Sequence, residues 1–315
     1  VIFMNVVVTG ANGFLGSRLC QNFSSRGINV IGTQRTLASE NAILLQPYDE
    51  KKWKEIFYNV DCVIHCASRV HILNDKSINS TELYDEVNVK WSLFLFNLAK
   101  DCGVNLFIYI STIKVFGEFT KLDKSINQSS RFNPKDSYSI SKLKAEQALR
   151  LIAGKSDTAL IVIRPPLVYG PGVKANFLNL IKIINLGIPL PFKFIRNKRS
   201  ILFIDNLIEF IYICMTNNKA YNRQFNISDK ESFSTPDLIK MISYNLKKKD
   251  RLFYFPIWIL FFFLQIIGKK AQLERLVGSF EVDTSFEEGF FNWSPPFSTS
   301  QGIEITVDWF RNAER

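Results

Sequence analysis

Cysteine is scarce in this sequence of 315 residues, and its five cysteines form no framework. They are odd in number and stand among apolar neighbours, at positions 20, 62, 66, 102 and 214. Disulfide-dependent secreted domains carry dense, paired cysteines, so the sequence indicates a reducing, cytoplasmic compartment. Cys62 and Cys66 frame an expected strand, and no His/Cys cluster with zinc-ligand spacing adjoins them. No metal site is expected.

Acidic residues are fewer than basic ones: the sequence has 29 aspartates and glutamates and 39 lysines and arginines, which gives a net charge of +10. Basic clusters stand at Lys193–Arg199 and Lys247–Arg251. The charge fits a solvated surface, an anionic small molecule or an anionic membrane. The sequence has no helix-turn-helix, zinc-finger or single-strand-binding signature, so nucleic acid is not expected as a partner.

A long apolar run of membrane-spanning length is missing as well. The uncharged stretch Leu252–Gly268 has 17 residues and contains Pro256, which makes it short for a spanning helix. Lysines stand on both of its sides. A core or dimer-interface helix is the favoured interpretation, and peripheral membrane contact is the alternative. No cleavable signal peptide is expected, because the N-terminal apolar run continues directly into a glycine-rich turn.

Short apolar runs do occur, and they alternate with helical patterns up to Arg164. This alternation is typical of a doubly wound parallel sheet, an α/β fold of the Rossmann type. We therefore expect a dinucleotide-binding domain over residues 1–164 and, over 165–315, mostly a smaller substrate-binding lobe that is interleaved with the sheet. The expected strands are Val6–Val8, Val30–Ile31, Ile43–Leu45, Cys62–His65, Leu106–Ile110 and Leu160–Arg164.

Helices are predicted between these strands and beyond them. A long helix is expected over Ser80–Lys100, before Gly103. In the second half, we expect a short helix over Phe177–Leu186 and a strand over Ile201–Ile204. Asp205 then resembles the N-cap of an apolar helix that continues through Met215.

The glycine-rich turn Thr9–Gly16 follows the first expected strand and precedes a helical pattern. Backbone N–H groups and the positive end of a helix dipole meet an anion at such a turn. Gly10 permits the tight turn, Gly13 lets a pyrophosphate approach the backbone, and Gly16 lets the helix and the strand pack closely. The spacing predicts a dinucleotide site.

Proton-transfer chemistry is indicated by Tyr138 and Lys142, which share one face of an expected helix because they are four residues apart. Tyrosine has a reference pKa of about 10, so exchange near neutral pH needs a shift of roughly 3 units, or ~4 kcal/mol. A lysine ammonium and an oxidised nicotinamide both favour the phenolate. The pairs Tyr48–Lys52 and Tyr244–Lys248 have the same spacing. Only Tyr138 follows the fifth strand, whose carboxyl end carries Ser111 and Thr112, placed to hydrogen-bond a reacting oxygen.

Together, Thr9–Gly16, Ser111-Thr112 and Tyr138–Lys142 resemble the extended short-chain dehydrogenase/reductases, in particular the NAD-dependent epimerase/dehydratase group that acts on nucleotide sugars. The resemblance extends through Asp61–Ser68, Val87–Val89, Arg164–Gly172 and the C-terminal Leu273–Ser285. The subgroup that it suggests holds UDP-glucose 4-epimerase-like proteins and the 4-keto reductases that make UDP-N-acetylquinovosamine or UDP-N-acetylfucosamine for bacterial surface polysaccharides such as O-antigen and capsule. The resemblance to these proteins implies that the substrate is a UDP-sugar and that the chain forms a homodimer.

The resemblance assigns roles to individual residues. Tyr138 is implied as the general acid/base, Lys142 as its partner, and Thr112 as the catalytic hydroxyl. Arg199 and Arg275 are implied as a diphosphate clamp, because arginine offers phosphate two parallel hydrogen bonds. Implied substrate contacts also include Thr112, Lys114, Asn176 and Phe177. The implied cofactor contacts are Gly10, Asn12, Gly13, Phe14, Leu15, Gly16, Arg35, Cys66, Ala67, Ser68, Ser111, Tyr138, Lys142 and Pro165.

One departure from the family pattern bears on the cofactor. An NAD-preferring fold carries Asp or Glu at the end of the second strand, whereas this sequence reads Gly32-Thr33-Gln34-Arg35-Thr36. Arg35 suits a 2′-phosphate, so NADP(H) is favoured over NAD(H). An enzyme that uses NADPH once and releases it reduces its substrate. We therefore expect reduction of the C4 keto group of a UDP-4-keto-6-deoxy-N-acetylhexosamine, with an NAD-dependent UDP-hexose 4-epimerase as the alternative and a non-catalytic dinucleotide-binding protein as a third.

Overall fold

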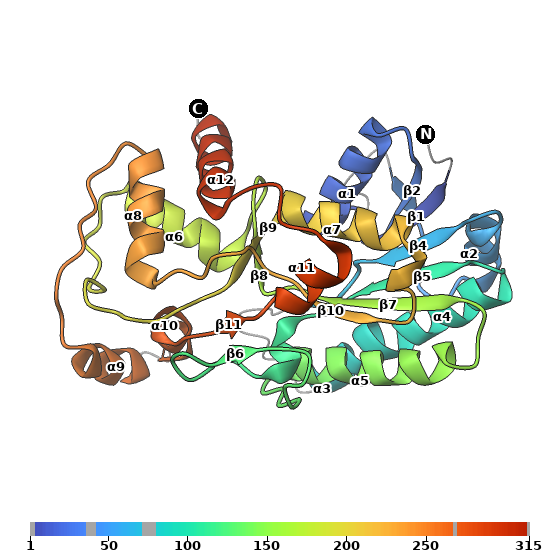
Figure 1. The fold of residues 1–315 in the computed structure, drawn as a ribbon, viewed down its shortest axis with the longest axis horizontal. Helices are drawn as coiled ribbons and strands as arrows, with labels where there is room; N and C mark the ends of the chain where they lie inside the picture. Colours follow the sequence, from blue (N-terminus) through green and yellow to red (C-terminus); the bar gives the residue numbers. More distant parts are fainter. Residues whose placement is uncertain (1–3, 36–41, 71–79, 267–269, 314–315) are drawn as a thin grey trace. The chain divides into compact units, whose positions relative to one another are not determined.

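The computed structural model describes residues 4–35, 42–70, 80–266 and 270–313. The chain divides into two compact units (Figure 1). Unit 1 comprises Val1–Val115, Phe132–Pro165 and Phe210–Phe225, and unit 2 comprises Phe116–Arg131, Pro166–Glu209 and Asn226–Arg315. The chain divides after Pro165, one residue beyond the expected boundary. Two segments do not follow this boundary: residues 116–131 precede it but belong to unit 2, and residues 210–225 follow it but belong to unit 1.

The sheet of unit 1 confirms the predicted α/β class. Its strand order is β10-β7-β5-β4-β1-β2-β3, and the pairings from β7 through β3 are parallel. The order reverses at β1, which lies between β2 and β4, and ligands of open parallel sheets bind outside the carboxyl ends of the strands at such a point. The strands are β1 (Asn5–Thr9), β2 (Asn29–Gln34), β3 (Ala42–Leu44), β4 (Cys62–His65), β5 (Leu106–Ile110), β7 (Ala159–Arg164) and β10 (Gln224–Asn226).

Helices cover both faces of this sheet, which is why β4 and β7 are buried along their whole length. On one face lie α2 (Glu50–Phe57), α4 (Trp91–Asp101) and α5 (Ser137–Ala153), as Figure 1 shows. Their apolar sides form a core with the sheet, in which the Phe96 and Phe107 rings meet edge to face. On the other face lies α1 (Phe14–Ser25), where the Phe23 ring contacts Tyr212.

The helix expected over Ser80–Lys100 is divided in the structure. It begins as α3 (Ser80–Tyr84), continues as a π-helical turn over Asp85–Lys90 and resumes as α4. The turn contains the buried Asn88, whose side chain bonds the backbone of Arg69 and the hydroxyl of Ser141. Single π turns are frequent at functional sites.

The expected N-cap role of Asp205 is wrong, because α7 (Ile204–Thr216) begins one residue earlier. The carboxylate at this junction comes from Asp229, which accepts hydrogen bonds from the backbone N–H of Phe203 and from the side chain of Asn206. A partner 26 residues away in sequence leaves no local signal of the kind that an N-cap residue gives.

Unit 2 is built from small parallel strand pairs and helices. The strand β6 (Ser125–Ile126) pairs with β11 (Glu281–Val282), and β8 (Leu167–Tyr169) pairs with β9 (Ile201–Phe203). Helix α8 packs on α6 and α12. The helices are α6 (Ala175–Asn185), α8 (Thr235–Asn245), α9 (Ile257–Ile266), α10 (Lys270–Val277), α11 (Ser285–Phe291) and α12 (Thr299–Ala313). Elsewhere in the chain, short 3-10 helices span Ile113–Phe116, where the chain passes from unit 1 to unit 2, and Asn218–Ala220 in unit 1.

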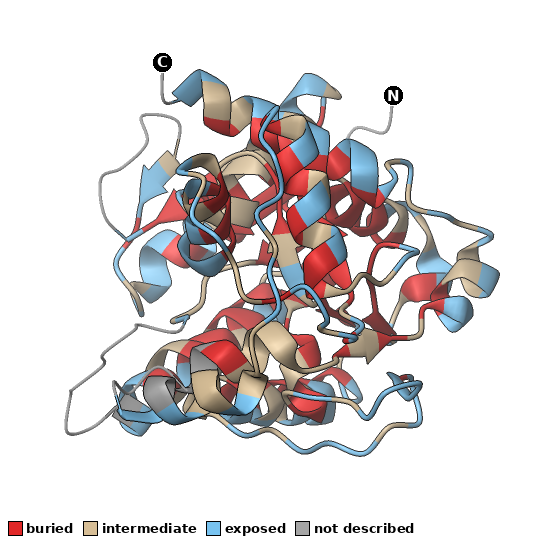
Figure 2. Cartoon of the chain, turned by 90° about the vertical axis from the view of Figure 1, so that its left-hand side faces the viewer, coloured by how far each residue is buried: buried red, intermediate tan, exposed pale blue. Residues whose placement is uncertain are grey.

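Burial follows this arrangement, since buried positions lie along the strands and the inner sides of the helices (Figure 2). Glu287 on α11 is an acidic residue, yet its side chain is fully buried. One carboxylate oxygen accepts from the backbone N–H of Asn226 at 2.8 Å and from the side chain of Gln128. Burial raises the pKa of Glu287 to about 7.

This raised pKa predicts a pH-dependent stability. An unfolded glutamate ionises near pH 4.3, so between about pH 4.5 and 7 the unfolded chain releases a proton that the folded chain retains. The free energy of unfolding falls as pH rises through this window, by at most about 3.5 kcal/mol, and the loss is complete above pH 7. The neutral Glu287→Gln variant removes this fall, which thermal unfolding at pH 5 to 8 measures.

Glu288→Gln, a change of the same kind at the next residue, is the matched control and keeps the pH dependence of the parent chain. Parallel stability curves for the parent chain and Glu287→Gln would contradict the assignment of the raised pKa to Glu287.

Candidate active site

The glycine-rich turn lies at the carboxyl end of β1, where its backbone makes two close approaches. Gly10 has φ +71°, and a Cβ built on it would lie 2.9 Å from the Cα of Ala67. A Cβ on Gly16 would collide with the carbonyl oxygen of Gly10. These two contacts leave room only for glycine, and they bring the loop after β4 against the loop after β1.

The helix that follows this turn presents its N-terminus without a side-chain cap. Gly13 is the N-cap of α1 and makes no side-chain capping bond, and the first turn holds no acidic residue. Phe14, Leu15 and Gly16 form that first turn. Its backbone N–H groups and the helix dipole therefore suit an anion, which is what the pyrophosphate of a dinucleotide requires.

A cavity of about 430 Å³ opens beside this turn, within unit 1. It brings together seven of the predicted cofactor residues, which come from the ends of β1, β2 and β4. These are Gly10, Asn12, Gly13, Arg35, Cys66, Ala67 and Ser68. The cavity volume, the uncapped helix and the glycine cradle together fit a nicotinamide dinucleotide.

Half of the cavity lining was not predicted. The additional residues follow β3 or project from β2, α2 and α4, and they are Thr33, Gln34, Leu45, Gln46, Pro47, Trp53 and Trp91. The loop after β3 could have been found, because the strand was predicted and ligands gather at the carboxyl ends of parallel strands. The two tryptophans could not, because a large apolar residue in a helix predicts burial alone.

The catalytic candidates lie at the start of α5. Asp136 caps this helix by accepting from the backbone N–H of Ser139 at 2.7 Å, and its second oxygen meets the Lys114 ammonium at 2.5 Å. Tyr138 stands in the first turn, and Lys142 follows one turn later. Hydrogen bonds join the Tyr138 side chain to Ser68 and Thr112. The structure thus brings Thr112 and Tyr138 together, with Lys142 one turn further along α5. It adds a hydrogen bond from Tyr138 to Ser68, which was predicted only as a cofactor contact.

The pKa of Tyr138 differs from the expectation, which was a lowered pKa. Burial raises the pKa of Tyr138 above its usual value, with the nearby Asp136 as the next contribution, and the hydrogen bonds of Ser68 and Thr112 oppose the rise only in part. Burial lowers the pKa of Lys142 to about 7, while the Glu146 carboxylate counteracts this effect. Tyr138 is therefore a protonated phenol at neutral pH, as a general acid must be.

Ser111 does not stand open beside Thr112. Its hydroxyl bonds the Glu146 carboxylate, which also receives Arg164 through two guanidinium nitrogens at 3.1 and 2.7 Å. All three side chains are at most 3% exposed. The predicted contact of Ser111 with a cofactor stays a prediction. So does that of Pro165, which follows β7 and whose carbonyl oxygen accepts from the backbone N–H of Ile113.

A second buried network supports the loop that carries Ser68. Asn88 accepts from the Ser68 hydroxyl at 3.0 Å and from the backbone N–H of Arg69 at 2.8 Å. Its amide nitrogen reaches the hydroxyl of Ser141 on α5 at 2.9 Å. The π-helical turn therefore links the loop after β4 to the catalytic helix.

His65 lies beneath this loop, at the end of β4, and is not a proton carrier at neutral pH. Thr9 and Ser92 bond its two ring nitrogens at 2.7 and 2.9 Å. Burial lowers the pKa of His65 to about 3, so the ring is neutral. Its position between the two hydroxyls makes it a packing element of the site.

Four predicted substrate residues belong to unit 2. The pKa of Arg199 is lowered to about 10. Burial is the larger cause, and the positive charge of the nearby Arg275 is the second. Arg275 also pairs with Glu118 at 3.2 Å. Asn176 is exposed in the first turn of α6, and the buried Phe177 ring stacks on Tyr169 at 5.2 Å. Two neighbouring arginine charges suit a diphosphate, while the sugar contacts stay predictions.

Two features are absent from the ranges that the structure describes. Those ranges contain no group of three or more His, Cys, Asp or Glu side chains arranged to hold a metal ion. Within the same ranges, every helix is too short or too polar to cross a bilayer.

A matched pair of glycine substitutions tests the cradle. Gly10→Ala introduces both a strained φ and a collision with Ala67, so we expect the affinity for NADP to fall at least tenfold, because the turn must move from its anion-binding position. Gly103→Ala carries the same strain at φ +74° with no atom within 4 Å of the added Cβ. Calorimetric titration compares the two.

Gly103→Ala loses stability but keeps the dinucleotide affinity of the parent chain. Equal affinities for Gly10→Ala and the parent chain would mean that the turn does not hold the dinucleotide.

Comparisons with known proteins bear on the family of this chain. Residues 6–228 match the model of the NAD dependent epimerase/dehydratase family. The UDP-glucose 4-epimerase of Vibrio cholerae is 34% identical over 98% of this chain and 96% of its own length.

Solved structures share the fold. The UDP-glucose 4-epimerase of Thermotoga maritima, solved with UDP-glucose, is 21% identical with a TM-score of 0.79, covering 99% of this chain and 100% of that one. The UDP-glucuronic acid 4-epimerase of Bacillus cereus, solved with NAD, is 21% identical with a TM-score of 0.78, covering 98% and 97%. With its parallel sheet, glycine cradle and tyrosine–lysine pair, this chain belongs to the NAD-dependent epimerase/dehydratase family.

Proposed function

We propose that this chain reduces the C4 keto group of a UDP-4-keto-6-deoxy-N-acetylhexosamine with NADPH. The observation that carries the proposal is Arg35, which lines the cavity directly after β2. The ribose of a bound dinucleotide approaches this position, where a carboxylate favours the free 2′-hydroxyl and an arginine favours a 2′-phosphate. A preference for NADPH indicates a cofactor that the reaction consumes and the enzyme then releases. An enzyme that uses its cofactor in this way is a reductase.

The residues of unit 1 divide the work of holding the cofactor. Gly10, Gly13 and the first turn of α1 would bind its pyrophosphate, Arg35 its 2′-phosphate, and the Cys66–Ser68 loop its nicotinamide half. A bound NADPH supplies a hydride to the carbonyl carbon.

Tyr138 supplies the proton in this proposal. Its raised pKa keeps the phenol protonated at neutral pH, so it can donate to the carbonyl oxygen as negative charge develops there. Thr112, which already bonds Tyr138, holds the same oxygen. The Lys142 ammonium, buried one helical turn away, then stabilises the resulting phenolate.

Substrate binding falls mostly to unit 2. Arg199 and Arg275 would bind the diphosphate of the UDP group, and Asn176 and Phe177 would contact the sugar. Lys114, which belongs to unit 1, would contact the sugar as well. Neighbouring arginines repel each other, so a dianion between them relieves that repulsion and adds charge-assisted hydrogen bonds.

Arg35 provides a test of the cofactor assignment. Arg35→Ser removes a charge-assisted contact to the 2′-phosphate, worth about 1.5–3 kcal/mol, so KM for NADPH rises roughly 10- to 100-fold. KM for NADH stays within threefold. The exposed Arg150→Ser on α5 is the matched control, and it changes neither constant. Equal losses with both cofactors after Arg35→Ser would remove the argument for NADPH.

Tyr138 provides a test of the chemistry. Tyr138→Phe removes the proton donor, and general acids contribute about 10²–10⁴-fold to rate, so kcat falls by that factor while NADPH affinity stays within threefold. Tyr244→Phe, which changes an exposed tyrosine that also has a lysine four residues later, leaves kcat unchanged. Full turnover by Tyr138→Phe would contradict the mechanism and would favour a non-catalytic dinucleotide-binding role.

A second candidate is an NAD-dependent UDP-hexose 4-epimerase, favoured by the 34% identity to the Vibrio cholerae enzyme of that name. The same residues serve it, with Tyr138 first taking a proton from the C4 hydroxyl and later returning it. Incubation with UDP-glucose or UDP-N-acetylglucosamine, without added cofactor, separates the two. Formation of the C4 epimer supports the epimerase, whereas NADPH consumption that requires a 4-keto sugar supports the reductase.

A further inference from the structure

Helix α9 carries three large apolar side chains that are exposed to a high degree. Trp258, Phe262 and Ile266 are four residues apart, so they project from one side of the helix, and they are 70%, 63% and 68% exposed. Large apolar side chains on a typical protein surface occur singly. Three in a row along one helical side indicate a binding surface.

The surface continues into the segment before α9. Tyr254 is exposed, and its ring contacts the exposed ring of Phe194 at 5.6 Å. Backbone hydrogen bonds hold these two segments together, from Leu190 to Arg251 at 2.9 Å and from Lys193 to Phe253 at 3.2 Å. We call the five exposed side chains Phe194, Tyr254, Trp258, Phe262 and Ile266 the aromatic face.

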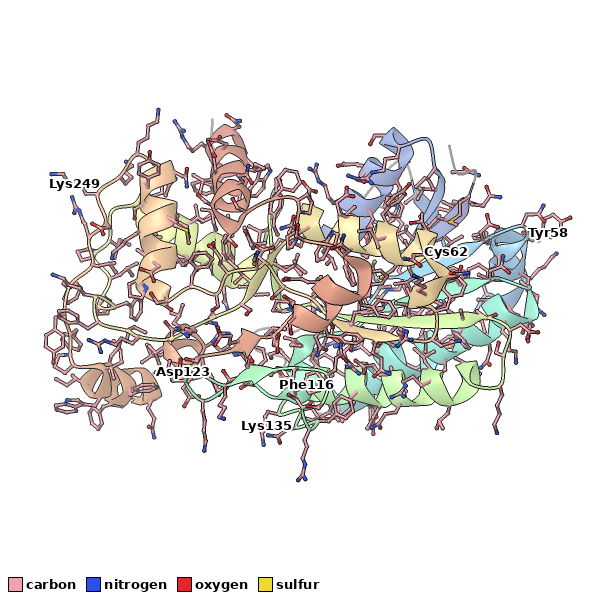
Figure 3. The ribbon with its side chains drawn as sticks, viewed as in Figure 1. Tyr58, Cys62, Phe116, Asp123, Lys135 and Lys249 are labelled. Carbon is pink, nitrogen blue, oxygen red and sulfur yellow. The ribbon has the colours of Figure 1, made fainter. Side chains whose placement is uncertain are left out.

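Basic residues accompany the aromatic face in the same two segments. Lys193 and Arg196 are exposed beside Phe194, and the Lys193 ammonium lies 5.8 Å from that ring. Arg251 is exposed three residues before Tyr254. Lys247–Lys249 precede it in sequence, but Figure 3 shows Lys249 at the end of unit 2 away from α9, so these lysines are not counted with the face. Residues 186–199 and 247–266 contain one acidic residue, Asp250.

This combination of chemistry fits one occupant best. Tryptophan and phenylalanine partition into the boundary between lipid headgroups and acyl chains, and nearby lysines and arginines are attracted to anionic headgroups. A two-fold interface with a second copy would bring the same basic residues of both copies together, which like-charge repulsion opposes. At ten residues, α9 is too short to span a bilayer.

We infer that unit 2 docks on an anionic lipid surface through the aromatic face, with α9 lying in the plane of the interface. The aromatic side chains enter the headgroup layer, and Lys193, Arg196 and Arg251 lie over the phosphates. This attachment is independent of the reaction at C4, so it holds whether the enzyme is a reductase or an epimerase.

The test uses the full chain and vesicles of phosphatidylcholine with or without 30 mol% phosphatidylglycerol, about a third, enough to give the surface a negative potential. Flotation measures binding, and quenching by lipids brominated on the acyl chain reports insertion of Trp258. We expect binding only to the anionic vesicles, weakened about fivefold for each of Lys193 and Arg251 changed to serine. The double variant Trp258→Ser/Phe262→Ser loses at least tenfold in binding.

The matched control replaces two exposed apolar side chains of unit 1, in Tyr58→Ser/Leu151→Ser, and binds vesicles like the parent chain. Thermal unfolding verifies that each variant is folded. No binding to anionic vesicles overturns the inference, and so does equal binding by both double variants. Loss of a dimer in Trp258→Ser/Phe262→Ser, measured by light scattering without vesicle binding by the parent chain, assigns the face to a second copy instead.

Discussion

A buried carboxylate, that of Glu146, joins the catalytic helix to the sheet. It lies on α5, and it accepts from Arg164 at the end of β7 and from Ser111 just after β5. The ion pair is almost completely buried, so losing one partner would leave an uncompensated charge, which costs about 3–5 kcal/mol. Arg164 also reaches Gln224 on β10 at 2.7 Å. Glu146 and Arg164 together thus tie α5 to β7, to β10 and to the residue after β5.

This constraint acts directly on the chemistry, because Glu146 stands one helical turn after Lys142, which itself stands one turn after Tyr138. The position and rotation of α5 decide whether the phenol reaches Ser68 and Thr112. The Glu146 charge also keeps the Lys142 pKa from falling further than burial alone would take it. Asp136 and Lys114 anchor the start of the same helix, and Asn88 anchors its side through Ser141. The proposed catalytic residues are therefore held by partners from several elements.

The sequence predicted those features that depend on local patterns. Buried strands showed as apolar runs, the anion site as glycines after a strand, and the tyrosine–lysine pair as residues four apart on a helix. Features that depend on contacts distant in sequence were missed, such as Glu146 with Arg164, Asp229 at the start of α7, and the π-helical turn at Asn88. The raised pKa of Tyr138 was missed for the same reason, because burial depends on elements that the spacing of Tyr138 and Lys142 does not reveal. A charged residue on an otherwise apolar helix side, beside Ala145 and Leu149, was the available signal for Glu146.

The proposed reaction transfers a hydride from NADPH to C4 of a nucleotide-linked sugar, at the site built on α5 and the glycine cradle. The most direct measurement uses NADPH deuterated at C4 of the nicotinamide, a UDP-4-keto-6-deoxy-N-acetylhexosamine, and NMR of the product. We expect one deuterium per sugar, bound to C4. A product without deuterium, or with deuterium on another carbon, would contradict it.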